Sequence, residues 1–211
     1  MTDYIRDERG EDYRGFVGPR ALYDVIGAAQ FCLMVRLGLR QHHYLCDVGC
    51  GSLRGGRFFI PYLEPGHYYG FDPNYWLIEE AVRHEIGQDM VDLKRPTFDA
   101  EADFTLTKFA QSFHYVVARS VFSHASLAQI ERCLSEAAKA MRAGGVFAAS
   151  MHLDGTETYT GGWAWPHCAH HRREDIESLA REFGLEMQVL ADEPRYGDQD
   201  WVTFVRAGRK R

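Results

Sequence analysis

Two glycines and an acidic residue have the spacing of a site for an adenosine-type ligand. Gly49 and Gly51 follow the short apolar run YLCDV, and Asp72 comes 21 residues after Gly51. Glycine has no Cβ atom, so it lets the backbone turn tightly and lets a ligand approach closely. An acidic side chain at the end of the next strand can accept hydrogen bonds from a ribose diol. The spacing therefore predicts a ribose-containing ligand at a turn between a strand and a helix.

The glycines do not match the fingerprint of dinucleotide-binding proteins. The pattern G-x-G-x-x-G, begun at Gly49, requires a third glycine at position 54. This chain has Arg54 there, and its next glycine is Gly55. The difference disfavours a pyrophosphate-binding turn and leaves a nicotinamide-dependent oxidoreductase as the weaker enzyme alternative.

Alternating strands and helices are predicted to position these residues. Apolar runs predict strands at 44–49, 67–72, 95–98, 113–120, 146–151, 185–193 and 198–207, and helical spacing predicts helices at 21–39, 55–63, 74–86, 126–142 and 173–183. The alternation predicts an α/β fold with a mostly parallel sheet and helices on both faces. The last two strands are joined by a short connection, so they are expected to pair antiparallel. Gly144 and Gly145 are expected to end the fourth helix.

Four segments carry a resemblance to a known family. DVGCGSLRGG, YYGFDP, VVARSVFSHAS and MRAGGVFAASM occur in this order. Together they resemble the class I S-adenosylmethionine-dependent methyltransferases, from about residue 20 to the end of the chain. The resemblance implies a Rossmann-like methyltransferase fold, with a seven-stranded sheet whose last strand is reversed. It also implies S-adenosylmethionine as the cofactor.

The same resemblance implies cofactor contacts at the ends of several strands. Asp47 orients the turn or reaches the methionine ammonium group through water. Gly49 and Gly51 pass beneath the methionine and ribose parts, and Asp72 binds the ribose hydroxyls. The other implied contacts are Pro73 and Trp76 beside the adenine, Asp103 and Phe104 at its edge and face, and Ala118 and Arg119 near the methionine end.

One position departs from the family pattern. The family often has glycine two residues after Gly51, where this chain has Leu53. In a wider turn, Arg54 is expected to bind the cofactor carboxylate through a charge-assisted contact. A solvated arginine at the start of a helix is the alternative interpretation of Arg54.

Two histidines are the candidate catalytic bases. Methyl transfer from a sulfonium is an in-line displacement, so the protein must align the acceptor atom with the methyl group and exclude water. An oxygen or nitrogen acceptor can also need a base with a pKa near the working pH. His124 follows the fourth strand and His152 follows the fifth. Packing or hydrogen bonding beside the cofactor is the alternative role for His124.

The segment 152–171 is predicted to be a long loop, rich in histidine, glycine and aromatic residues. A loop of this length in a compact domain is more often functional than not. Trp163 and Trp165 are predicted to line an apolar or aromatic acceptor pocket. The histidines of HCAHH at 167–171 do not share one helix face, so no metal site is predicted.

Composition limits the remaining choices. The 211 residues carry a formal net charge of −6, with 45% hydrophobic and 26% charged residues. The length fits one domain at 19–211. Residues 1–18 are polar and interrupted by glycines, so they are predicted to form a flexible arm or a lid. The acidic balance disfavours a nucleic-acid partner, and the apolar stretches are too interrupted for a membrane span. Scattered cysteines fit a reducing cytoplasm.

The predicted function is methylation of a small-molecule acceptor, on oxygen in preference to nitrogen or carbon. A non-catalytic cofactor-binding protein, regulatory or a partner subunit, is the alternative from another class. A protein or RNA acceptor stays open, because the acceptor is chosen by segments that vary between family members.

Overall fold

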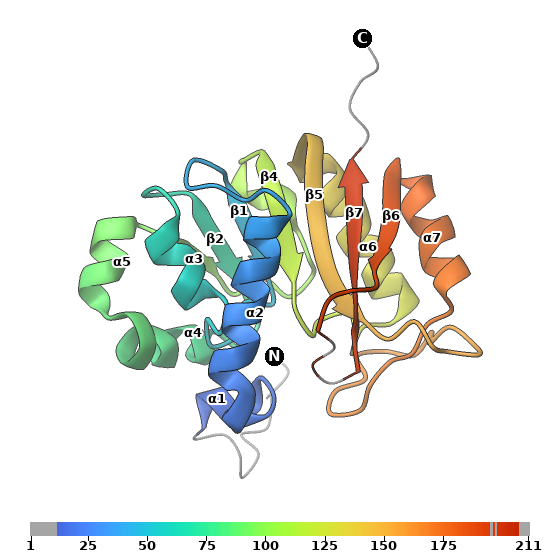
Figure 1. The fold of residues 1–211 in the computed structure, drawn as a ribbon, viewed down its shortest axis with the longest axis horizontal. Helices are drawn as coiled ribbons and strands as arrows, with labels where there is room; N and C mark the ends of the chain where they lie inside the picture. Colours follow the sequence, from blue (N-terminus) through green and yellow to red (C-terminus); the bar gives the residue numbers. More distant parts are fainter. Residues whose placement is uncertain (1–11, 195, 197, 207–211) are drawn as a thin grey trace. The chain divides into compact units, whose positions relative to one another are not determined.

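The structure is a computed structural model that describes residues 12–194, 196 and 198–206. Its described strands form a seven-stranded sheet in the order β3-β2-β1-β4-β5-β7-β6, with helices around it (Figure 1). The backbone divides into two compact units. The first unit comprises Met1–His42 and Gly49–Glu101, and the second comprises His43–Val48 and Ala102–Arg211.

The first unit contains two short strands and most of the short helices. Strands β2 (Tyr68–Phe71) and β3 (Thr97–Asp99) pair in parallel. The helical segments are α1 (Tyr13–Phe16), η1 (Arg20–Leu22), α2 (Tyr23–Arg36), α3 (Gly56–Tyr62), α4 (Tyr75–Ala81), the π-helical turn η2 (Val82–Ile86) and α5 (Gln88–Lys94). Of these, α1 and α5 were not predicted from the sequence.

An aromatic cluster holds α2 against α3. The ring of Phe31 lies 6.1 Å from that of Phe58, 5.7 Å from that of Phe59 and 5.2 Å from that of Tyr62. Aromatic side chains bury a large apolar area, so such contacts dominate the energy of helix packing. The cluster fixes the helix that precedes the glycine turn against the helix that follows it.

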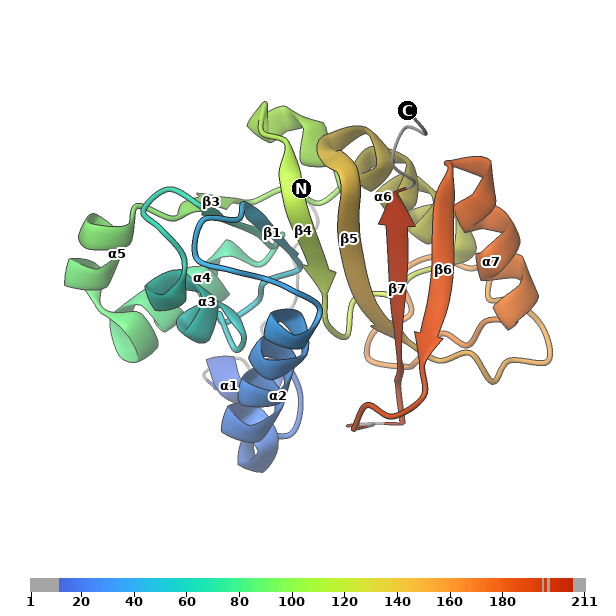
Figure 2. The ribbon, with the colours of Figure 1, turned by 45° about the horizontal axis from the view of Figure 1, so that its top comes forward.

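The second unit contains the remaining five described strands. They are β1 (Leu45–Val48), β4 (Phe113–Ala118), β5 (Met141–Met151), β6 (Leu185–Leu190) and β7 (Asp200–Arg206), with η3 (Leu106–Phe109), α6 (Leu127–Ala140) and α7 (Arg173–Glu182). Strands β1, β4 and β5 run parallel, whereas β7 pairs antiparallel with both β5 and β6. Figure 2 shows β5, β7 and β6 side by side. The predicted fold class is confirmed, with the last strand as the reversed one.

Buried rings form the centre of the second unit. Phe147 on β5 lies 5.7 Å from both Phe122 and Phe204, and all three side chains are fully buried. Helix α6 begins with the capping box that Ser126 and Gln129 form. This packing positions the ends of β4 and β5, and the candidate bases lie in the segments that follow them.

The end of α6 differs from the prediction. The helix ends at Ala140, and Met141 already has extended backbone angles and pairs with Phe113 of β4. Gly144 and Gly145 therefore lie inside β5, where Gly144 has a φ of 75° and the register with β4 shifts. Met141 pairs with β4 and is therefore part of the sheet. The two glycines lie at an irregularity of β5 and do not end the helix.

The predicted N-terminal arm and the question of a membrane span can be addressed only for the described residues. Residues 1–11 of the predicted arm lie outside the described residues, and α1 forms just after them. Within the described ranges, no helix has the length and apolar character needed to cross a membrane.

Candidate cofactor site and active site

The turn after β1 takes a left-handed backbone conformation at three positions. The φ angles are 62° at Gly49, 52° at Gly51 and 53° at Leu53. For leucine this conformation costs about 1–2 kcal/mol. The Leu53 side chain is fully buried, and burying a leucine stabilises a protein by about 1.5–3 kcal/mol. Burial therefore offsets the strain, and Leu53 keeps the conformation that a glycine would adopt.

The structure brings Asp72 onto this turn. Asp72 follows β2, and its Oδ2 accepts a hydrogen bond from Gly51 N at 3.1 Å. Its Oδ1 accepts another from Asn74 N at 2.8 Å. Burial raises the pKa of the Asp72 carboxyl, while the hydrogen bonds from Asn74 and Gly51 oppose the rise. The structure thus brings the glycine turn and the acid into contact, whereas the ribose role of Asp72 stays a prediction.

The segment 13–17, which comprises α1 and Val17, contacts the same turn. A Cβ atom on Gly51 would lie 2.8 Å from Cγ1 of Val17, closer than real Cβ atoms approach their neighbours. The ring of Phe16 stands edge-on to Trp76, with centroids 5.5 Å apart. Arg54, buried here, donates from Nη1 to the Val17 carbonyl at 2.6 Å. Two predicted cofactor residues, Trp76 and Arg54, thus contact this segment.

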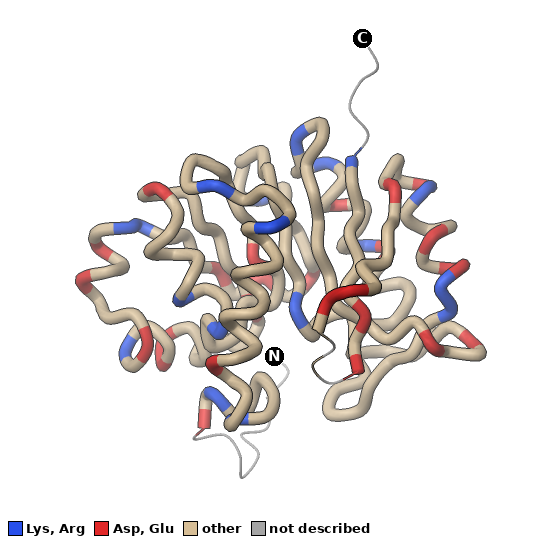
Figure 3. The backbone as a smooth tube through the Cα atoms, in the orientation of Figure 1, with Lys and Arg blue, Asp and Glu red and all other residues tan. Residues whose placement is uncertain are grey.

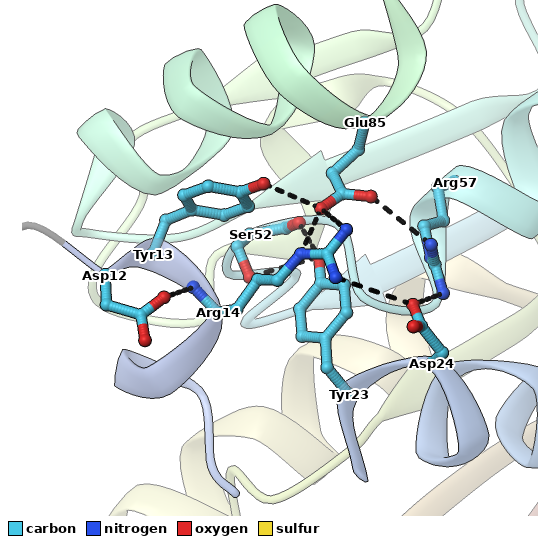
Figure 4. A network of polar contacts seen from close by, with 8 residues as sticks. All are labelled: Asp12, Tyr13, Arg14, Tyr23, Asp24, Ser52, Arg57 and Glu85. Atoms are coloured by element: carbon cyan, nitrogen blue, oxygen red, sulfur yellow. Dashed lines mark hydrogen bonds and ion pairs between the residues drawn. The ribbon is translucent and has the colours of Figure 1, made fainter. Parts of the chain in front are cut away.

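A buried carboxylate holds that segment in place (Figure 4). The Glu85 side chain, only 3% exposed, accepts from Nε of Arg14 at 2.6 Å and from the Tyr13 hydroxyl at 2.8 Å. Arg57 reaches the other Glu85 oxygen at 3.2 Å and contacts Asp24 at 2.5 Å. Hydrogen bonding to Glu85 raises the pKa of the Arg14 guanidinium well above its usual range. The network joins α1, α2, α3 and η2.

Tyr23 connects α2 to the glycine turn. Its hydroxyl donates to the backbone carbonyl of Ser52 at 2.6 Å. Burial raises the pKa of Tyr23 to about 12, so the hydroxyl keeps its proton and remains a donor. Together with Glu85, this contact fixes the N-terminal part of the described chain on the turn.

Glu85→Gln is expected to lower the free energy of unfolding by about 2 kcal/mol. Removing one member of a buried, hydrogen-bonded charge pair costs about 3–5 kcal/mol. Arg14 and Arg57 are 30% and 17% exposed, so partial hydration reduces the loss. Urea unfolding at neutral pH measures the difference.

Glu80→Gln is the matched control for this prediction. Glu80 lies one turn earlier and pairs with Arg83 and His84 at the surface. Exposed pairs contribute about 0–1 kcal/mol, so this variant should stay near the wild-type value. Equal losses in the two variants would contradict the role assigned to Glu85.

Arg119, at the end of β4, ties together several elements of the second unit. Its guanidinium donates to Ser150 Oγ at 2.7 Å, to the Tyr196 carbonyl at 2.6 Å and also to Gln199 Oε1. It also lies over the ring of Trp201, 5.5 Å from the centroid. Gln199 was missed from the sequence, because nothing in its local pattern marks a residue that bonds a distant strand end.

His124 has the geometry of a base. Its Nδ1 lies 2.7 Å from the backbone carbonyl of His167, which fixes the proton on Nδ1 and leaves Nε2 as the acceptor. Burial lowers the pKa of His124, and the His167 carbonyl opposes this in part, so the neutral form dominates at neutral pH. The exposed Trp163 ring lies 5.8 Å from the imidazole.

His152 follows β5 directly and is buried. Burial lowers the pKa of His152, and nearby His170 lowers it further. Its ring stacks on that of His170, with centroids 4.6 Å apart. His152 is thus held in a cluster of histidines, a setting different from that of His124.

The other predicted residues are placed as follows. Asp47 is buried in β1, opposite Val117 of β4, and Ala118 is the fully buried last residue of β4. Pro73 is an exposed residue between β2 and α4. Asp103 and Phe104 lie beyond β3: the Asp103 backbone accepts from Arg132 Nε at 2.6 Å, and Phe104 is buried.

The acidic residue at the strand end beside Asp72 is Asp99 and not the predicted Asp103. Strand β3 runs one residue further than predicted and ends at Asp99, whose carbonyl accepts from Asp72 N at 3.1 Å. Ligands in such sheets bind at the carboxyl ends of strands. The strand-end rule therefore points to Asp99 in place of Asp103, a residue that the sequence analysis missed because its third strand ended too early.

Comparisons with known proteins agree with the fold and with the turn. Residues 46–147 match the family model described as a methyltransferase domain. This segment contains the glycine turn, Asp72 and His124. No curated protein sequence matches the chain.

Solved structures share the fold at low sequence identity. Magnesium protoporphyrin IX methyltransferase from Synechocystis PCC 6803 with bound SAM is 18% identical, with a TM-score of 0.65 over 96% of this chain and 89% of that one. A sugar N-methyltransferase from Streptoalloteichus is 15% identical, with a TM-score of 0.64 over 86% and 88%. The pyocyanin biosynthetic protein PhzM is 13% identical, with a TM-score of 0.62 over 85% and 55%.

The strand order agrees with the fold of the class I S-adenosylmethionine-dependent methyltransferases. Residues 46–147, which include the glycine turn and its acid, match a methyltransferase domain. The cofactor of this family is S-adenosylmethionine.

Proposed function

We propose that the protein transfers the methyl group of S-adenosylmethionine to a hydroxyl oxygen of a small molecule. The hydrogen bond from Gly51 N to Asp72 carries the proposal, because it puts a buried carboxylate on a glycine turn at a strand end. A carboxylate offers about four acceptor positions. The amides of Gly51 and Asn74 use two, which leaves two for a ribose diol.

The remaining cofactor contacts follow from the family and from the strand ends. Trp76 and Pro73 flank the adenine, and Asp99 is a better candidate for its edge than Asp103. Arg54 is the cation for the methionine carboxylate, once its Nη1 exchanges the Val17 carbonyl for that group. Asp47, Ala118 and Arg119 keep the roles that the family resemblance implies, as do Gly49 and Phe104.

His124 is the proposed base. In the displacement, the acceptor oxygen attacks the methyl carbon, the carbon–sulfur bond breaks, and S-adenosylhomocysteine leaves. The acceptor hydroxyl gives its proton to Nε2 of His124, which is left free by the contact of Nδ1 with His167. His152 is the second candidate.

Two observations favour a small acceptor. The structural relatives named above include a porphyrin methyltransferase and a sugar N-methyltransferase. Along the described chain, basic positions are interspersed with acidic ones and do not form one basic tract of the kind that binds nucleic acid (Figure 3).

Transfer of a labelled methyl group tests the proposal. The full chain is incubated with methyl-labelled S-adenosylmethionine and a panel of phenols, hydroxylated heterocycles and sugars. Label is expected in at least one hydroxyl compound and not in its O-blocked analogue. Binding of S-adenosylhomocysteine without transfer to any compound would support the non-catalytic alternative, and transfer to an amine alone would overturn the choice of oxygen.

A further inference from the structure

Two segments of the second unit are joined by backbone contacts, one just after β5 and the other just before α7. His152 forms a bridge with His170, and Asp154 forms one with Arg172. The backbone N–H of His171 donates to the His152 carbonyl at 3.0 Å. His171 itself is fully buried, with Nε2 at 3.1 Å from a backbone carbonyl of the adjoining loop. The backbone thus holds the flanking side chains in fixed register.

This register gathers three groups of metal-ligand type. Three potential ligand atoms lie within 4.8 Å of one another, one each from His152, Asp154 and His170. Nδ1 of His170 lies 2.7 Å from Oδ1 of Asp154. The two imidazoles stack with ring planes inclined by 25°. Two imidazoles and one carboxylate form a ligand set that transition metals use.

The buried histidine of this set has a ring nitrogen without a partner among the described residues. His152 is only 6% exposed, and its Nε2 is inaccessible to water and without a hydrogen-bond partner among the residues that the structure describes. The backbone of Asp198 interacts with the same ring, and Nε2 is the ring nitrogen that has no partner within the described part of the chain. Histidines that bind metals usually donate their other ring N–H to a carbonyl or carboxylate.

We propose that His152, Asp154 and His170 bind one divalent transition-metal ion of the zinc type. The ion would satisfy the buried His152 nitrogen and replace the proton between His170 and Asp154. This differs from the sequence-based expectation of no metal, which considered only neighbours within 167–171.

The site can close on an ion without moving its buried member. Zinc–nitrogen distances of about 2.0–2.1 Å put ligand atoms about 3.3 Å apart, so the widest separation must shrink by about 1.5 Å. The side chains of Asp154 and His170 are 70% and 47% exposed. They can therefore rotate toward His152, which stays fixed in the core.

Three protein ligands leave coordination positions open. An acceptor hydroxyl bound at one of them would release its proton more readily, because the ion stabilises the resulting oxyanion. This role rests on the proposed function, whereas the metal site does not.

Titration of the untagged, chelator-treated full chain with Zn²⁺ and with Co²⁺ tests the site. Calorimetry is expected to show one Zn²⁺ per chain, and Co²⁺ should give visible absorption bands. His170→Ala and Asp154→Asn should each weaken binding by at least about 10-fold, the size typical for loss of an outer-shell partner. Both side chains are exposed, so these variants are expected to fold, whereas His152 is buried and is left unchanged.

His167→Ala and Cys168→Ser are the matched controls, because they lie in the same loop outside the cluster. They should bind Zn²⁺ as the wild type does. Absence of binding by the wild type, or equal binding by His170→Ala and Asp154→Asn, would overturn the proposal. Zn²⁺ binding without methyl transfer would support the site and count only against the proposed function.

Discussion

Asp72→Asn is expected to weaken the binding of S-adenosylhomocysteine by about 100-fold. A hydrogen bond to a charged group contributes about 1.5–3 kcal/mol, and the carboxylate is proposed to accept two from the ribose. Loss of about 3 kcal/mol corresponds to about 100-fold in the dissociation constant. Asparagine keeps the volume of the side chain and one carbonyl oxygen for the turn. Calorimetry on the wild type and the variant gives the comparison.

Asp89→Asn is the control for the lost negative charge. Asp89 is exposed in the first turn of α5, in the same unit. Its replacement should leave the affinity unchanged. Urea unfolding of both variants shows whether the turn has kept its stability. Unaltered affinity in Asp72→Asn would remove the ribose assignment.

His124→Gln is expected to reduce kcat by about 100-fold or more, the usual contribution of a positioned base. The affinity for S-adenosylhomocysteine should not change. In the wild type, kcat should rise with pH and level off, because only the neutral imidazole accepts a proton. Burial lowers the pKa of His124 below 6.5, so the rise should lie on the acid side of that value. The variant should lose this acid limb.

His167→Gln is the matched control for the base. His167 contacts His124 through its backbone carbonyl, which the substitution keeps. Its pH profile should therefore retain the acid limb. A limb that persists in His124→Gln would show that another group titrates, and the same measurement on His152→Gln would then identify it.

Features set by local spacing were predictable from the sequence. The positions of Gly49, Gly51 and Asp72 follow from a strand, a turn and the end of the next strand, and in the structure Gly51 and Asp72 are in contact. The reversed last strand followed from a connection too short for a crossover. Both arguments need only neighbouring elements.

Features set by distant contacts were not predictable. Glu85 lies 71 residues from Arg14 in sequence, and neither residue has a local pattern that marks its partner. The same holds for His152 and His170, which are joined by a backbone bridge across the loop. At Gly144 and Gly145 the local pattern predicted the wrong structure. The glycines indicated a helix end, but the helix ends earlier because Met141 pairs with β4.

If the cofactor binds at the glycine turn as proposed, the approach of Val17 to Gly51 links two binding events. On the proposed function, the cofactor and the segment containing Phe16 and Val17 use the same face of the turn. Binding of the cofactor must then displace this segment, so the free energy that holds the segment on the turn weakens the observed cofactor affinity. By reciprocity, bound cofactor weakens the attachment of the segment by the same free energy. The Glu85 network would thus set how readily the enzyme exchanges spent cofactor for fresh, although Glu85 itself need never contact either molecule.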